Sequence, residues 1–127
     1  MLVSRRSDRW SQPAAVPEAS VEVLRPEGDL DAKMAPEIRR KVTSLPPGTR
    51  LVVDLGATDF IDSVGVGLLI GISRSVRANG GSVVLADPRS SVAKVLRATG
   101  VAEIVPVTET AAEAVQLVAG PAGVPLG

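Results

Sequence analysis

The chain has 127 residues, and its 14 Lys and Arg are balanced by 14 Asp and Glu, so the formal net charge is zero. This balance gives no electrostatic argument for nucleic acid or a membrane surface as the main partner. Cysteine and histidine are both absent, which excludes disulfides, the usual zinc sites and the Ser-His and Cys-His pairs of nucleophilic enzymes. An enzyme built from this chain would have to use carboxylates, Lys or Ser alone.

The two ends of the sequence are expected to lie outside the folded domain. Residues 1–19 are polar and rich in Pro and Ala, which predicts a flexible arm or an irregular first strand. Residues 20–119 have the length of one domain with its own core, and residues 120–127 are expected to form a frayed tail. The sequence shows neither a signal peptide nor the roughly 20 apolar residues of a membrane-spanning helix, so we expect a cytoplasmic protein.

The first half of the domain is predicted to run strand, helix, strand. Residues 21–24 are β-like and end before Pro26, which suits the end of a strand because proline cannot donate to a sheet. A helix is expected to start near Pro36, and its apolar stripe consists of Met34, Ile38, Val42 and Leu45. The apolar run at residues 51–53 predicts a central strand that is covered on both faces.

The second half alternates helices and strands. A long helix is expected from Asp62-Ser63 to about Asn79, with a buried face made of Val64, Leu68, Leu69, Ile72 and Val76. The elements expected after it are a strand at 82–86, a helix at 88–99, a strand at 104–107 and a helix at 110–118. This order predicts an α/β fold with a mostly parallel sheet of four strands, or five if the N-terminal arm adds one, joined by right-handed crossovers.

The most specific polar feature is Asp62-Ser63, at the junction between a strand and a helix. Either side chain can be the N-cap that accepts from a free amide of the first turn, and a plain cap explains the serine without any function. The functional alternative is a phosphorylation site, because unpaired amides and the positive end of the helix dipole tolerate a phosphate. Gly65 and Gly67 would let a partner approach closely, or would let the helix pack tightly on the sheet.

Two further patterns are incomplete as sites for chemistry. Gly65-Val66-Gly67 is not a dinucleotide loop, because Ile70 stands where Gly-x-Gly-x-x-Gly needs its third glycine, and no Gly-Lys-Ser/Thr element is present. The three carboxylates of Asp54, Asp59 and Asp62 follow one strand closely and could hold Mg²⁺ for phosphoryl chemistry. Without a phosphate-binding element, turn and cap roles are favoured for them, and neither a metal nor a cofactor is expected.

Three segments together resemble a known family. They are Gly28-Asp29-Leu30-Asp31, Leu51-Val52-Val53-Asp54-Leu55 and Phe60-Ile61-Asp62-Ser63-Val64-Gly65-Val66-Gly67-Leu68. In this order they are similar to the STAS-domain family, and more closely to the bacterial anti-sigma factor antagonists, over residues 21–118. The resemblance implies a mixed sheet of four or five strands with about four helices, and no catalytic activity.

The resemblance also implies a switch at one residue. In this family the serine directly after the aspartate of the motif, here Ser63, is phosphorylated by an anti-sigma factor that is also a serine kinase. The unphosphorylated antagonist binds the anti-sigma factor and frees the sigma factor; phosphorylation breaks that complex, and a phosphatase restores it. The residues expected to bind the partner are Asp31, Asp62, Ser63, Val64 and Gly65, and no direct contact with nucleic acid or a membrane is implied. The family usually has Ser or Thr where this chain has Val64.

Two alternatives to this switch stay open at the level of the sequence. The first is a STAS scaffold or sensor subunit that binds a protein or small ligand without being phosphorylated. The second belongs to another class, a small Mg²⁺-dependent enzyme that uses Asp54, Asp59 and Asp62. The sequence predicts no particular oligomeric state.

Overall fold

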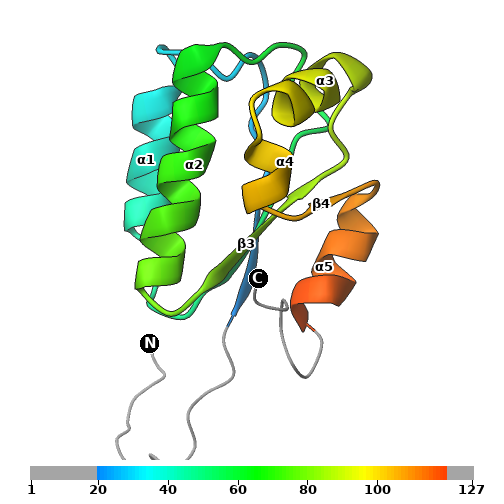
Figure 1. Cartoon of the computed structure of the whole chain (residues 1–127). Helices are drawn as coiled ribbons and strands as arrows, with labels where there is room; N and C mark the ends of the chain where they lie inside the picture. The colour runs from blue at the N-terminus through cyan, green and yellow to red at the C-terminus, as the bar shows by residue number, and fades with distance from the viewer. Residues whose placement is uncertain (1–19, 120–127) are drawn as a thin grey trace, which may run out of the picture.

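The computed structural model describes residues 20–119, which form a parallel β-sheet with helices on both faces (Figure 1). The strands are β1 (Val21–Leu24), β2 (Arg50–Asp54), β3 (Ser82–Ala86) and β4 (Val107–Thr108). They lie side by side in chain order, and each neighbouring pair is parallel. The predicted α/β class and mostly parallel sheet are confirmed, and every pair of described strands is parallel, so the mixed sheet implied by the resemblance is not seen among them. The expectations for residues 1–19 and 120–127, including a fifth strand, lie outside the described part of the chain.

The helices divide unequally between the two faces of the sheet. They are α1 (Ala35–Thr43), α2 (Ser63–Ala78), α3 (Ser90–Ala98), α4 (Val101–Ile104) and α5 (Ala111–Ala119). In this sheet the strands are neighbours in chain order. When all crossovers between such strands are right-handed, every connecting helix lies on the same face of the sheet. Accordingly, α1 to α4 share one apolar cluster, whereas α5 follows β4 and covers the opposite face (Figure 1). None of the described helices combines the length and the apolar character that a membrane crossing requires.

The central strand is buried on both sides, as its sequence predicts. Leu51 and Val53 of β2 belong to the cluster that α1 to α4 cover, whereas Val52 between them packs with Ala114 and Val118 of α5. Successive side chains of a strand point to opposite faces. An unbroken apolar run therefore needs cover on both faces, and the prediction for this strand is confirmed.

One predicted strand begins later than expected, because a short helix precedes it. We expected a strand over residues 104–107, but Ile104 ends α4 and β4 begins three residues later. Val101 and Val105 are both buried, and the amide of Val105 donates to the carbonyl of Val101 at 2.9 Å. A spacing of four residues is helical, and Gly100, with φ of 82°, separates this turn from α3. The described chain thus has five helices, one more than expected.

The loops that follow β1 and β2 are joined at the C-terminal edge of the sheet, the upper end in Figure 1. Leu30 forms an isolated parallel bridge with Ile61 and is fully buried. The amide of Leu30 donates to the carbonyl of Phe60 at 2.9 Å, and its carbonyl accepts from the amide of Asp62 at 3.3 Å. This bridge fixes the point at which the chain enters α2.

Candidate functional site

The start of α2 is capped by Asp62. Its backbone is extended, with φ of −108° and ψ of −170°, and its Oδ1 accepts from the amide of Gly65 at 3.0 Å. Its carbonyl accepts from the amide of Val66 at 2.9 Å. Ile61, before the cap, and Val66 pack in the same apolar cluster, at the spacing of a hydrophobic staple. Of the two cap candidates in the sequence, the structure assigns the role to the aspartate.

Ser63 is consequently the first residue of α2, with its side chain exposed. Within residues 20–119, neither its hydroxyl nor its backbone N–H makes a hydrogen bond, and the same is true of the N–H of Val64. The first amides of a helix have no partner inside the helix, and they carry the positive end of its dipole. The hydroxyl is therefore exposed beside two amides that have no partner among the described residues.

The two glycines of the motif have different surroundings. A Cβ placed on Gly65 would collide with the carbonyl oxygen of Leu30 and lie 2.7 Å from Cγ1 of Ile61. Gly65 is buried, so the close approach of α2 to the preceding loops accounts for it. A Cβ on Gly67 would have no atom within 4 Å. Of the two explanations offered by the sequence, tight internal packing therefore applies to Gly65 and not to Gly67.

Asp31 lies beside the start of α2 through the joined loops. It directly follows Leu30, whose carbonyl accepts from the amide of Asp62. The Oδ1 atom of Asp31 accepts from the amides of Lys33 at 3.0 Å and Met34 at 3.2 Å, which shapes the turn before α1. The structure therefore brings the expected acidic position and Ser63 to the same edge of the sheet.

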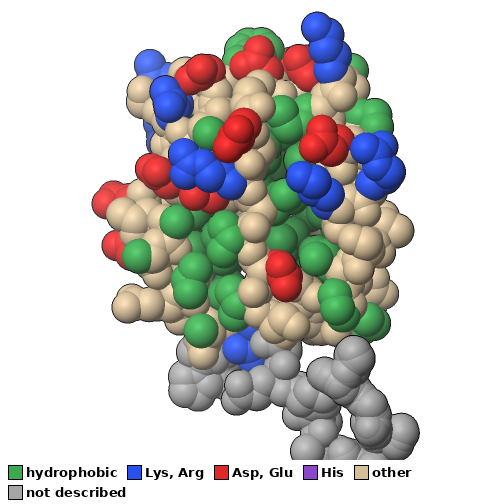
Figure 2. Space-filling model, turned by 180° about the vertical axis from the view of Figure 1, so that it is seen from behind, with side chains coloured by type: hydrophobic (Ala, Val, Ile, Leu, Met, Phe, Trp, Pro, Cys, Tyr) green, Lys and Arg blue, Asp and Glu red, His purple; other side chains and the backbone are tan. Residues whose placement is uncertain are grey.

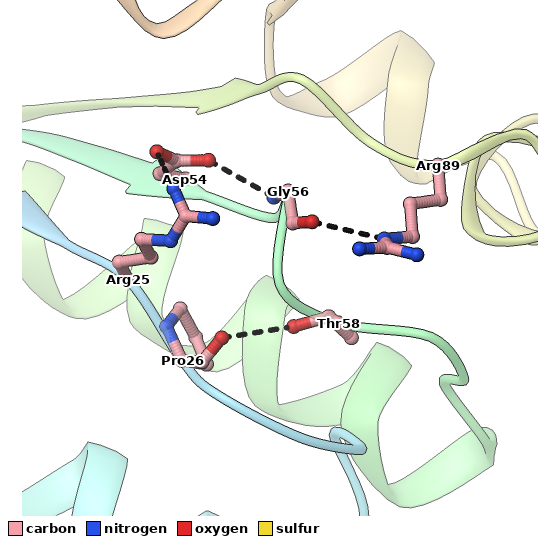
Figure 3. A network of polar contacts seen from close by, with 6 residues as sticks. All are labelled: Arg25, Pro26, Asp54, Gly56, Thr58 and Arg89. Atoms are coloured by element: carbon pink, nitrogen blue, oxygen red, sulfur yellow. Dashed lines mark hydrogen bonds and ion pairs between the residues drawn. The ribbon is translucent and has the colours of Figure 1, made fainter.

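The three carboxylates considered for Mg²⁺ have separate partners. The buried carboxylate of Asp54 pairs with Arg25 at 3.3 Å and accepts from the amide of Gly56 at 2.9 Å (Figure 3). Asp59 pairs with Arg89 at 2.9 Å, and Asp62 caps α2. Within residues 20–119, no three acidic side chains are grouped as a metal site would need. The turn role favoured by the sequence applies to Asp54 and the cap role to Asp62, whereas Asp59 forms an ion pair with Arg89 instead.

The loop between β2 and α2 is held by contacts that the sequence did not reveal. Nε of Arg89 donates to the carbonyl of Gly56 at 2.9 Å, and the hydroxyl of Thr58 donates to the carbonyl of Pro26 at 3.4 Å (Figure 3). The hydroxyl of Ser91 donates to the carbonyl of Asp59 at 3.1 Å. The loop is thus attached both to the segment after β1 and to the start of α3, which gives the entrance to α2 a fixed position.

Two apolar side chains near Ser63 are exposed, and one of them corrects an expectation. Val64 was predicted on the buried face of the long helix, but 40% of it is exposed, whereas Leu68, Leu69, Ile72 and Val76 are buried as predicted. The first turn of α2 lies at the upper edge of the sheet (Figure 1), where Gly65 packs against the preceding loop while Val64 is exposed. Phe60, two residues before the cap, is 54% exposed, and no pattern in the sequence indicated this exposure.

Comparisons with known proteins show which proteins resemble this chain in sequence and in fold. A family model described as the STAS domain matches residues 12–114. The anti-sigma F factor antagonist of Lysinibacillus sphaericus is 32% identical over 81 residues, covering 61% of this chain and 69% of that protein. The structure of the anti-sigma factor antagonist SpoIIAA in its unphosphorylated form superposes with a TM-score of 0.64 and 28% identity, covering 80% of this chain and 90% of the other.

The same fold also occurs in a different setting. The STAS domain of the SulP transporter from Vibrio cholerae superposes with a TM-score of 0.65, covering 79% of this chain and 80% of the transporter domain. At 22% identity this likeness concerns the fold alone.

Proposed function

This chain belongs to the STAS domain family, and from that premise we propose that it is an anti-sigma factor antagonist that acts by partner switching at Ser63. In this proposal the unphosphorylated protein binds an anti-sigma factor and thereby frees a sigma factor. The anti-sigma factor is also the serine kinase that phosphorylates Ser63, and a phosphatase reverses the modification. The relatives named as anti-sigma factor antagonists support the general role.

The observation that carries the proposal is that Asp62, and not Ser63, is the N-cap of α2. Asp62 caps α2, and within residues 20–119 Ser63 makes no side-chain hydrogen bond that a phosphate would disturb. The two unpaired amides at the helix start and the helix dipole favour a phosphate there. The modification adds about −1.5 to −2 charges, enough to change a binding surface without unfolding the protein.

The surface proposed for the partner comprises Asp31, Asp62, Ser63, Val64 and Gly65. The bridge between Leu30 and Ile61 places Asp31 next to the start of α2. Gly65 is buried and does not contact the partner directly. Its missing side chain lets α2 approach the loop at Leu30 closely, which fixes the position of Ser63. The activity proposed is binding rather than catalysis, with no metal or cofactor required.

The proposal is tested by phosphorylation in vitro. The purified full chain is incubated with ATP and the purified anti-sigma factor kinase of the same organism, and the sites are mapped by mass spectrometry. We expect one phosphate, on Ser63, and none on the Ser63→Ala variant. Ser75→Ala is the matched control, because Ser75 is also an exposed serine of α2, and we expect it to be phosphorylated like the wild type. A phosphate located elsewhere, or none, would contradict the switch.

One observation favours a second candidate, a STAS domain that binds its partner without phosphorylation. Val64 is apolar and exposed, whereas the family usually has a hydroxyl at this position. The same experiment separates the two candidates. An unmodified chain that still binds the anti-sigma factor would support the second one.

A further inference from the structure

Phe60 and Val64 form an exposed apolar pair on either side of Ser63 in the chain. Phe60 is the single phenylalanine of the sequence, and more than half of it is exposed. Isolated apolar side chains on a surface are ordinary. Here two of them lie within five residues, at an edge where charged side chains gather (Figure 2). Both side chains are therefore accessible to a partner that binds near Ser63.

The segment that carries Phe60 is held in one place. The carbonyl of Phe60 accepts from the amide of Leu30 at 2.9 Å. The preceding residue, Asp59, is held twice, by Arg89 through its carboxylate and by Ser91 through its carbonyl. A side chain on a preorganised segment loses little freedom when it binds, and aromatic residues are enriched among those that dominate binding affinity.

We propose that Phe60 and Val64 insert into an apolar pocket of the anti-sigma factor and supply most of the affinity of that complex. A phosphate on Ser63 then breaks the complex chiefly because a dianion would have to lose its water between two apolar contacts. Asp59 contributes little repulsion, because Arg89 pairs with its carboxylate at 2.9 Å. This inference rests on the proposed function.

The first test measures the affinity of the full-length variant Phe60→Ala for the purified anti-sigma factor by calorimetry. We expect the Kd to rise by about 10- to 100-fold, with a melting temperature close to that of the wild type because Phe60 is largely exposed. The control is Ile104→Ala, since Ile104 is 45% exposed but lies on α4, and its Kd should stay within about twofold of the wild type. Phe60→Leu, which keeps an apolar side chain, should lose less affinity than Phe60→Ala.

The second test concerns how phosphate acts. The ratio of Kd values for the phosphorylated and unphosphorylated chains is measured at about 50 mM and about 500 mM NaCl. Repulsion between exposed charges is screened by salt, whereas the cost of removing water from a phosphate is not. We expect the ratio to change by less than about threefold, and a fall of about tenfold or more at high salt would overturn the desolvation mechanism.

The outcomes separate this inference from the function on which it rests. If the wild type binds and is released by phosphorylation while Phe60→Ala binds as tightly as the wild type, the apolar contact is wrong and the partner switch stands. If the wild type does not bind the anti-sigma factor at all, both are wrong.

Discussion

The two ends of α2 are built in opposite ways. At the C-terminal end, Gly80 adopts φ of 85° and donates to the carbonyl of Arg77 at 2.9 Å, and Gly81 donates to the carbonyl of Val76 at 2.9 Å. The guanidinium of Arg77 also donates to the carbonyl of Ile104 at 2.7 Å. This end is therefore closed by the protein's own groups.

The N-terminal end keeps free groups. Asp62 satisfies one amide there, while Ser63 and Val64 stay exposed with their backbone N–H groups unpaired among the described residues. A helix end that the fold already closes loses stability when it is modified. An end with unpaired amides can accept a new charged group at little cost, and that difference makes it suitable as a switch.

The largest predicted effect on stability concerns a feature that both ends of α2 share. At each end a glycine packs against a backbone carbonyl. A Cβ would collide with the carbonyl of Leu30 at Gly65 and with that of Thr49 at Gly81. We expect Gly65→Ala and Gly81→Ala each to lower the free energy of unfolding by about 1–3 kcal/mol, because the backbone has to move. Urea denaturation measures the change.

The control for these variants is Gly67→Ala, in the same helix. Nothing lies within 4 Å of its added Cβ, and alanine is the better helix former. The free energy of unfolding should therefore rise by about 0.5–1 kcal/mol. Equal changes at Gly65 and Gly67 would show that α2 does not press on the loop at Leu30.

A smaller effect distinguishes the cap from the switch residue. Asp62→Ala removes the hydrogen bond to the amide of Gly65 and should lower the free energy of unfolding by about 1 kcal/mol. Ser63→Ala removes no described hydrogen bond, so its change should lie within about 0.5 kcal/mol. If Ser63→Ala costs as much as Asp62→Ala in urea denaturation, the serine shares the capping role.

A still smaller change in stability is expected when the loop before α2 is released. Arg89→Ala removes an exposed ion pair and a hydrogen bond to Gly56, and the loss in unfolding free energy should be below about 1 kcal/mol. Hydrogen exchange at the amide of Thr58, which donates to the carbonyl of Leu55, should nevertheless become faster. Lys41→Ala, which removes an ion pair with Glu37 on α1, should leave that exchange unchanged.

The smallest effect on stability is predicted for a negative charge at the switch itself. Ser63→Glu places a carboxylate at the start of α2, where the helix dipole favours it. The melting temperature should therefore change by less than about 2 °C, while binding to the anti-sigma factor is markedly weakened. A thermal scan and calorimetry on the same sample measure both. A large fall in melting temperature would show that the serine supports the fold.

Much of the fold follows from local sequence patterns. The apolar run of β2 and the helical spacing of Leu68, Leu69, Ile72 and Val76 predicted burial correctly, because periodicity determines which face an element turns to the core. Periodicity says nothing about where the covering layer ends, and for that reason Val64 was wrongly placed in the core. The helical turn that buries Val101 and Val105 was missed, because the short apolar run at residues 104–107 was interpreted as a strand. Periodicity alone does not distinguish a short buried strand from a buried helical turn.

The candidate site was predictable only in part. The motif pointed to Asp62 and Ser63, but both residue types cap helices well, so the choice between them depended on backbone geometry. The contact between Arg89 and Gly56 joins residues 33 positions apart, and no local pattern indicates such a pair. Phe60 looks like an ordinary core residue in the sequence, since its exposure results from the way the loop is held.

The unequal covering of the sheet has a consequence during synthesis of the chain. The face formed by Val52, Val84 and Ala86 is covered by α5 alone among the described elements, through Ala114 and Val118. These are among the last described residues to leave the ribosome, and the guanidinium of Arg50 reaches the carbonyl of Val118 at 2.7 Å. Among the described elements, nothing else covers this face, so a sheet that forms before α5 emerges would expose apolar side chains to a chaperone or a neighbouring chain.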